Sequence, residues 1–342
     1  MMFVPDERIV RVLKTMTLAF SVALYQTAPV AEIIRLSQVA EDLGFQTAWL
    51  GDSQCLWREA YVTLGALAVS TRAIKLATSV TNPITRHLTV TASALCSLAE
   101  LTAGRVVLGI GRGETAVKLA GTRRATVDEL RDAVGVIRAL CRGEAVRIDG
   151  AEARLEYAAA SPMAVPVYLP GLAPRMLRLA GEIADGVLLT VGAEPRYIRA
   201  GIAALDDGLR AAGRSRDAMR IAARIPCSVS EERGARRHVR SSVALAVLQP
   251  KPFDFDEEDR SAVEKIRHAY DYRRHLTLDA AHGDLVPDRL VDKFAIAGTP
   301  DECLDRVRAL AATGIDELNI VLMSPTPERL LRTFASRIME RV

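Results

Sequence analysis

Polar and small residues directly follow three short apolar segments, and their types suit a site for a flat redox ring. These stretches are 51–57, 78–83 and 109–114. The first contains Asp52, Ser53 and Trp57, and the indole of Trp57 is able to cover a ring. The third contains Gly111 and Gly113, whose lack of a side chain lets the backbone approach a planar ligand. It ends at Glu114, a titratable group suited to acid–base work.

A fourth stretch has the features of a phosphate site. Gly171, Leu172 and Ala173 precede Pro174 and Arg175, and proline favours the first position of a helix. The free N–H groups and positive dipole end of that helix would attract a phosphate, and Arg175 would add a charge-assisted contact. The alternative is an ordinary capped turn with Arg175 in solvent.

These stretches must be positioned by a repeating unit of apolar strand and amphipathic helix. The hydrophobic pattern predicts strands at 17–24, 47–50, 74–80, 105–110, 165–169, 186–190, 220–229 and 317–322. It predicts helices at 30–43, 59–70, 89–101, 127–140, from 174 onward, at 195–212 and at 327–341, with a small hairpin at 146–156. Eight alternating units favour a single α/β domain over 1–342, a (β/α)₈ TIM barrel. Neither a Walker A motif nor GxGxxG follows the first strand, which disfavours a Rossmann fold.

Residues 231–293 are too many for a simple connection between strand and helix. They contain an acidic stretch at 254–259 and a basic-aromatic stretch at 268–275. We expect a mostly helical insertion after the seventh strand. In a barrel it would lie over the mouth as a lid that helps to define the substrate pocket. The alternatives are a subunit contact or a solvated surface.

Composition excludes several classes of function. The net charge of +3 gives no broad basic field for nucleic acid, and the arginines at 236–240 are expected on a solvated helix face. The five cysteines are scattered, without metal-like spacing, which indicates a reduced, cytoplasmic protein with cysteines in the core. No His or carboxylate spacing indicates a metal site, and His87 is expected to have a structural role.

The N-terminus resembles a signal peptide, because Arg8, Arg11 and Lys14 precede the apolar run 16–25. We interpret that run as the first buried strand, since a helix and a second strand follow at βα spacing. No apolar run reaches the roughly 20 residues of a membrane span.

Several motifs together resemble the luciferase-like monooxygenase superfamily, and within it the branch of coenzyme F420-dependent methylenetetrahydromethanopterin reductases. They are TSVTNPITRH at 78–87, GRVVLGIGRG at 104–113, VYL at 167–169, PRMLRLAGEIADG at 174–186 and AGTPDE at 297–302. The resemblance extends from about the second strand to the C-terminus. It implies a barrel that binds F420, or FMN as the alternative, at the C-terminal ends of its strands.

The resemblance also implies where the cofactor lies. Relatives hold the ring against a bulge in the third strand that contains a non-proline cis peptide, which here would join Ser79 to Val80, with Thr81 and Asn82 beside it. They bind the phosphate at the turn after the fifth strand, which matches 171–175. Thus the two stretches identified from their chemistry coincide with the family's cofactor site.

One departure concerns the second strand. Some F420-dependent sugar-phosphate dehydrogenases have a His there followed by a Trp, whereas this chain has Ser53 and retains Trp57. Glu114 matches an acidic proton donor of those relatives and is the preferred catalytic acid. Ser53 would hydrogen-bond the ring or the substrate. Leu88 replaces a proline of many relatives, and we expect only a small local effect.

The expected function is F420-dependent hydride transfer to or from a small organic substrate with a C=C, C=N or C=O bond. The first alternative is an FMN-dependent monooxygenase, and the second is a non-catalytic flavin-binding protein. The expected partners are a small-molecule substrate and a second copy of the chain, because relatives commonly form dimers. Such a dimer requires an apolar helix face.

Overall fold

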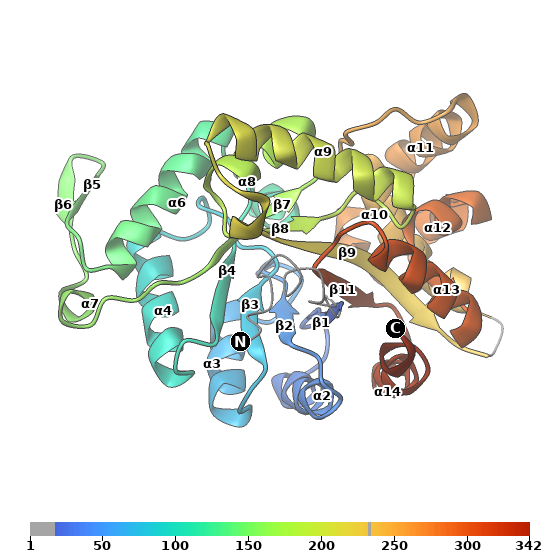
Figure 1. Ribbon diagram of the computed structural model, residues 1–342, viewed down its shortest axis with the longest axis horizontal. Coiled ribbons are helices and arrows are strands. Elements are labelled where there is room, and N and C mark those ends of the chain that lie inside the picture. Colours follow the sequence, from blue (N-terminus) through green and yellow to red (C-terminus); the bar gives the residue numbers. More distant parts are fainter. Residues whose placement is uncertain (1–17, 232–233) are drawn as a thin grey trace, which may run out of the picture.

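The computed structural model describes residues 18–231 and 234–342 of the chain. Parallel strands alternate with helices, and Figure 1 shows the strands at the centre with helices around them. The barrel strands are β1 (Ala19–Leu24), β2 (Thr47–Leu50), β3 (Lys75–Thr78), β4 (Val106–Gly109), β7 (Val167–Gly171), β8 (Gly186–Leu189), β9 (Arg220–Val229) and β11 (Glu317–Leu322).

The sheet closes on itself. The strands pair in the order β1-β2-β3-β4-β7-β8, β8 also pairs with β9, and β9 leads through β11 back to β1. Closure satisfies the backbone hydrogen-bonding groups that edge strands would leave open. The predicted (β/α)₈ TIM barrel is therefore confirmed. The bounds of the second, seventh and eighth predicted strands agree with β2, β9 and β11.

Seven outer helices match the predicted amphipathic segments to within a few residues. They are α2 (Val30–Asp42), α3 (Ala60–Ser70), α4 (Leu88–Leu101), α6 (Val127–Cys141), α8 (Pro174–Ile183), α9 (Pro195–Ala211) and α14 (Pro327–Arg337). The prediction did not include α5 (Thr115–Leu119) and α13 (Pro300–Ala311). Local sequence features fix where some of these helices begin. Thr126 and Glu129 form a reciprocal capping box at the N-terminus of α6, and Pro174 occupies the first turn of α8.

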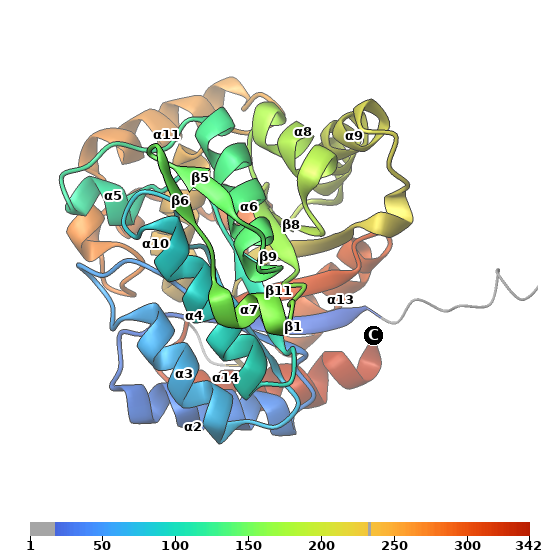
Figure 2. The ribbon, with the colours of Figure 1, turned by 90° about the vertical axis from the view of Figure 1, so that its left-hand side faces the viewer.

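The predicted hairpin consists of β5 (Val146–Ile148) and β6 (Ala151–Ala153), which pair antiparallel, followed by the short helix α7 (Glu156–Ala160). It projects from the barrel beside α6, as Figures 1 and 2 show. None of its residues lines the main cavity described below.

The segment after β9 is mostly helical, as expected. It contains α10 (Ala235–Leu248), α11 (Glu257–Ala269) and α12 (Asp288–Phe294), with short 3₁₀ turns η2 (Tyr272–Arg274) and η3 (Ala281–Leu285). Helix α10 packs directly on β9, so it takes the place of an ordinary barrel helix. The prediction missed β10 (Ile296–Gly298), which extends the sheet beside the end of β9.

One expectation from the sequence is wrong, and another concerns residues that the structure does not describe. Four cysteines are buried as expected, but Cys55 is exposed, because it lies in the loop after β2 and not in a strand or helix. The basic residues Arg8, Arg11 and Lys14 lie outside the described residues, and β1 begins at Ala19 rather than at 17. Within the described ranges, no helix has the length and apolar character that crossing a bilayer requires.

Candidate active site at the barrel mouth

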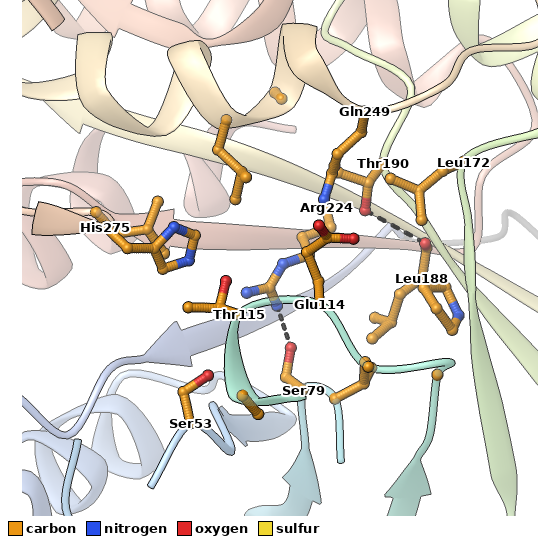
Figure 3. Close-up of a pocket in the computed structure, with 18 of the residues that line it drawn as sticks. Ser53, Ser79, Glu114, Thr115, Leu172, Leu188, Thr190, Arg224, Gln249 and His275 are labelled. Atoms are coloured by element: carbon orange, nitrogen blue, oxygen red, sulfur yellow. Dashed lines mark hydrogen bonds between the residues drawn. The ribbon is translucent and has the colours of Figure 1, made fainter. Parts of the chain in front are cut away.

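A cavity of about 540 Å³ opens at the C-terminal ends of the strands. This volume lies within the range of about 300–1,000 Å³ typical of small-molecule sites. The structure brings eleven of the predicted site residues to its wall: Asp52, Ser53, Trp57, Ser79, Val80, Asn82, Gly111, Gly113, Glu114, Leu172 and Ala173. Figure 3 shows Ser53, Ser79, Glu114 and Leu172 around the opening.

The exits of β3 and β4 are joined closely enough to form one wall. Thr81 N donates to Gly109 O, and Gly111 N donates back to Thr81 O, both at 2.9 Å. A Cβ at Gly109 would lie 2.0 Å from the Thr78 carbonyl oxygen, so only glycine fits there. The peptide bond between Ser79 and Val80 is cis, as the resemblance predicted.

The carboxylate of Asp52 is engaged in holding that wall. It accepts hydrogen bonds from Thr81 Oγ1 and Arg86 Nη1, both at 2.7 Å, and its side chain is almost fully buried. Arg86 also pairs with Glu59, and its guanidinium lies 4.7 Å from the centre of the Tyr61 ring. Thus Asp52 stabilises the loop after β3 from within the cavity wall, while Thr81 lies behind the wall.

Asn82 closes the loop after β3 as a turn residue. Its side-chain oxygen accepts from the N–H groups of Ile84 and Thr85, at 3.0 and 2.9 Å. The next turn ends at His87, whose Nδ1 accepts from Thr89 N at the start of α4. His87 therefore caps a helix, in agreement with its expected structural role.

Aromatic rings form another part of the cavity wall. Trp57 packs against Tyr25 with 4.6 Å between ring centres, and His275 lies 5.8 Å from Trp57. A Cβ at Gly51 would lie 2.4 Å from the Trp57 ring, so this glycine is what allows the indole to fold over the end of β2. Nδ1 of His275 is 2.7 Å from the hydroxyl of Tyr270.

Glu114 stands at the mouth, at the beginning of α5. Its carboxylate pairs with Arg124 at 2.8 Å, and the hydroxyl of Tyr272 lies 3.5 Å from it. The carboxylate is only partly buried, so it is open to the cavity and to solvent. This position permits proton exchange between a ligand and water.

Positive charge collects near the start of α8. Arg112 lines the cavity, and its pKa is lowered by burial and by the neighbouring charges of Arg124 and Arg175. Leu172 and Ala173 line the cavity, whereas Gly171, Pro174 and Arg175 do not, and Pro174 and Arg175 are exposed. Three guanidinium groups beside a helix N-terminus favour an anionic group at this end.

A model of the luciferase-like monooxygenase family matches residues 13–317. The chain belongs to this family. Among curated relatives, the 5,10-methylenetetrahydromethanopterin reductase of Archaeoglobus fulgidus is 34% identical over 288 residues, which cover 82% of this chain and 86% of the relative. The F420-dependent glucose-6-phosphate dehydrogenase of Nakamurella multipartita is 27% identical over 331 residues, which cover 91% and 92%.

The fold of this luciferase-like protein also agrees with solved structures. The coenzyme F420-dependent tetrahydromethanopterin reductase from Methanopyrus kandleri matches with a TM-score of 0.77 at 24% identity, over 95% of this chain and 99% of that one. At this level of identity the likeness supports the barrel architecture.

The donors and acceptors of the cavity fit a ring with a polyhydroxyl linker and a phosphate. Val80 and Gly111 offer a wall with little side-chain bulk, and the arginines near α8 suit the phosphate. Gln249 also lines the cavity, and its Oε1 is buried with no hydrogen-bond donor among the described residues. A ligand hydroxyl would satisfy this acceptor. The cavity therefore fits a deazaflavin or a flavin, and no cluster of metal-ligating side chains occurs within the described ranges.

Sequence reasoning missed several residues of the wall. Tyr25 and Thr190 follow β1 and β8, so the same rule of examining strand ends would have found them. Arg224 lies within β9, where a charged residue among buried apolar neighbours was the available signal. His275 and Tyr272 belong to the basic-aromatic stretch of the predicted lid, but no local pattern singles them out as cavity residues.

Proposed function

We propose that this protein is an F420-dependent oxidoreductase that moves a hydride between the deazaflavin and a small organic substrate. The substrate bond would be C=C, C=N or C=O, or the product of its reduction in the reverse direction. When bound, the deazaflavin supplies two-electron hydride chemistry with little reactivity toward oxygen. The observation that carries the proposal is the 34% identity with a reductase over 82% of the chain, in a protein whose cavity joins the ends of β2, β3, β4 and β7.

The wall residues would hold the cofactor in three parts. Val80 and Gly111 would contact one face of the ring, and Trp57 would lie at its edge. Gln249 would accept from the linker hydroxyls. The turn at 171–175 would bind the phosphate through its backbone N–H groups and Arg175. The proposal is supported by Val80, Gly111, Trp57 and Gln249 in the cavity wall, with Leu172 and Ala173 of the phosphate turn beside them.

Glu114 would hold or release the proton that accompanies hydride transfer. Its carboxylate reaches both the cavity and solvent, and Arg124 fixes it in position. Ser53 would hydrogen-bond the substrate or the ring, since it is a largely buried residue with a hydroxyl on the cavity wall. A positioned acid of this kind contributes about 10²–10⁴ in rate.

The second candidate is an FMN-dependent monooxygenase, and the description of the matching family favours it. The ring wall and phosphate turn would accept either cofactor. Titration of the cofactor-free protein with F420 and with FMN, followed by tryptophan fluorescence, separates the two. We expect F420 to bind at least about tenfold more tightly, a difference of about 1.4 kcal/mol. Preferential binding of FMN would overturn the first candidate.

We also infer that the part of the predicted insertion that follows the barrel helix α10 acts as a lid. Gln249, Tyr272 and His275 come from this part and line the cavity, so its position affects access to the barrel mouth. Tyr272 contacts Glu114 on the opposite rim. A lid of this kind excludes water during hydride transfer.

We infer further that a second copy of the chain packs on α3 and α4. These helices lie next to each other (Figure 1) and expose Val62 (68%), Val69 (72%), Val90 (54%) and Leu101 (56%). Soluble proteins rarely leave such a patch uncovered. It supplies the apolar helix face that the expected dimer requires.

A further inference from the structure

Arg224 is a cation inside the barrel whose hydrogen-bond partners are all neutral. Its Nη1 donates to Ser79 Oγ and, at 3.2 Å, to Asn319 Oδ1, and its Nη2 donates to Tyr25 Oη at 2.8 Å. Figure 3 shows the guanidinium between Ser79 and the upper part of the cavity. These three bonds fix its plane and leave part of its donor set unused.

The nearby acids are committed to other arginines. Asp52 pairs with Arg86, and Glu114 pairs with Arg124. Within the described ranges no carboxylate forms an ion pair with Arg224. A partly buried guanidinium without a counter-ion is costly unless a ligand supplies the negative charge. The cavity floor is therefore a candidate anion site.

The side chains around Arg224 add hydrogen-bonding groups without adding negative charge. His275 lines the same cavity, and burial, His282 and the charge of Arg224 lower its pKa to about 4. At neutral pH its imidazole is therefore uncharged, with Nδ1 engaged by Tyr270. Ser53 offers a hydroxyl on the same wall. An anionic ligand on Arg224 would therefore meet a cation without a carboxylate partner and these neutral groups, while the cavity carboxylates Asp52 and Glu114 stay paired with other arginines.

Arg224 touches the proposed ring wall through its hydrogen bond to Ser79, but it enters the cavity from a different strand than the residues that would hold the cofactor. Val80, Gly111 and the turn at 171–175 follow β3, β4 and β7, whereas Arg224 belongs to β9, which pairs with β8 and β11. The rings of Tyr25 and Trp57 lie beside it and supply an apolar surface. This end of the cavity suits the substrate, with an anionic group on Arg224 and a carbon body against the rings.

We propose that Arg224 binds a carboxylate of the substrate, so that this enzyme acts on an organic acid. The planar fork of a guanidinium matches the two oxygens of a carboxylate. Ser53 and the imidazole of His275 would contact the same end of the substrate. The substrate class rests on the proposed function, because it names what the hydride is exchanged with.

The test uses the cofactor-free protein and two isosteric probes. Benzoate and benzamide have the same shape and differ in charge, and the fluorescence of Trp57 reports their binding. We expect benzoate to bind about tenfold or more tightly than benzamide, because only benzoate pairs with Arg224. Arg224→Gln should remove this preference, and Arg224→Lys should restore part of it. Partial restoration of the preference in the Lys variant would also show that substitution at residue 224 leaves the site folded.

The matched control removes one positive charge from another part of the wall. Arg267 also lines the cavity, but it is exposed and pairs with Glu264 at 3.3 Å. Arg267→Gln should leave the benzoate preference unchanged. Equal losses in the Arg224 and Arg267 variants would show a general charge effect and would overturn the proposal.

Two further titrations separate a carboxylate site at Arg224 from a role of Arg224 in cofactor binding and from a site for phosphate-like anions. Arg224→Gln should bind F420 as the unchanged protein does, whereas a loss of F420 affinity with no benzoate preference would assign Arg224 to the ring. If phenylphosphonate binds and benzoate does not, the proposal that Arg224 binds a carboxylate is overturned. Failure of the unchanged protein to bind F420 would remove the proposed function, while the benzoate result would still stand for the anion site.

Discussion

The hydroxyl of Tyr272 lies 3.5 Å from Oε1 of Glu114 and so joins the two rims of the cavity mouth. Tyr272 belongs to η2 in the segment after β9, and Glu114 begins α5. Lys118 on α5 adds a second contact, with its ammonium 3.6 Å from the centre of the Tyr272 ring. Burial and the charge of Glu114 raise the pKa of Tyr272, so the phenol remains a donor.

Tyr272→Phe should loosen this closure while leaving the aromatic contact with Lys118 in place. The lost hydrogen bond corresponds to about 0.5–1.5 kcal/mol, so we expect the dissociation rate of F420 to rise several-fold. Stopped-flow displacement of bound F420 measures it. Tyr157→Phe is the control, because Tyr157 contacts Ser93 on the outer surface of the barrel. Equal rates for Tyr272→Phe and the unchanged protein would argue against a lid.

Glu114→Gln should separate the proton-transfer role from binding. The amide keeps the size of the side chain and cannot donate an acidic proton, so kcat should fall by about 10²–10⁴. Turnover is measured with F420 and any acid from a panel of unsaturated, keto and imino acids that the unchanged protein converts. Affinity for F420 should change little. Unchanged turnover together with unchanged cofactor binding would remove Glu114 from the chemistry.

The sequence predicted those parts of the site that depend on local pattern. Apolar strands followed by polar residues located Ser53, Ser79 and Glu114, because parallel strands of a barrel all end at the same rim. Strand β10 was missed because three residues are too few for a detectable alternation. It forms only because β9 extends beyond the barrel and offers a free side.

Other residues depended on tertiary placement. His275 reaches the cavity because the chain from α11 to η3 folds back over the rim, and helical periodicity does not fix that path. Arg224 lies in a strand whose pattern is otherwise apolar and buried. A strand-interior arginine is a signal of a polar barrel interior that sequence reasoning did not use, and its partners Ser79, Asn319 and Tyr25 come from three separate regions of the chain.

Gly109→Ala should destabilise the joined exits of β3 and β4. The new Cβ would lie 2.0 Å from the Thr78 carbonyl oxygen, and overpacking of this kind costs about 1–3 kcal/mol. Gly135→Ala is the matched control, because Gly135 lies within α6 with open space around it. That change should stabilise the protein by about 0.5–1 kcal/mol. Urea unfolding of both variants checks the opposite signs, and a stable Gly109→Ala protein would contradict the close approach.

Val69→Asp should disrupt the proposed dimer. Val69 is 72% exposed on α3, so a charged side chain there costs the isolated chain little. In a dimer through this face the charge would be buried without a partner. Sedimentation should show a dimer for the unchanged protein and a monomer for the variant. Val342→Asp, at another exposed apolar residue, should remain dimeric, and dimers from both variants would place the interface elsewhere.

The burial of His275 predicts a definite pH dependence of stability. The pKa of His275 in the folded state is about 4, whereas the pKa of an unperturbed histidine is 6.5, so the unfolded chain binds more protons between these two values. Unfolding is therefore favoured as pH falls from 6.5 to 4, and the full shift corresponds to about 3 kcal/mol. The neighbouring groups are Tyr270, His282 and Arg224, and the latter two oppose protonation of the imidazole.

His275→Gln removes that titration while keeping a hydrogen-bonding side chain. The unfolding free energies of the two proteins, measured from pH 7 to pH 4, should differ by a pH-dependent amount. Carboxylates elsewhere titrate in both proteins and cancel in this difference. The variant should lose less stability on acidification than the unchanged protein. A difference that stays constant across the range would mean that His275 takes up protons equally well in the folded and unfolded states. The statement that the imidazole beside Arg224 is held neutral by burial would then be wrong.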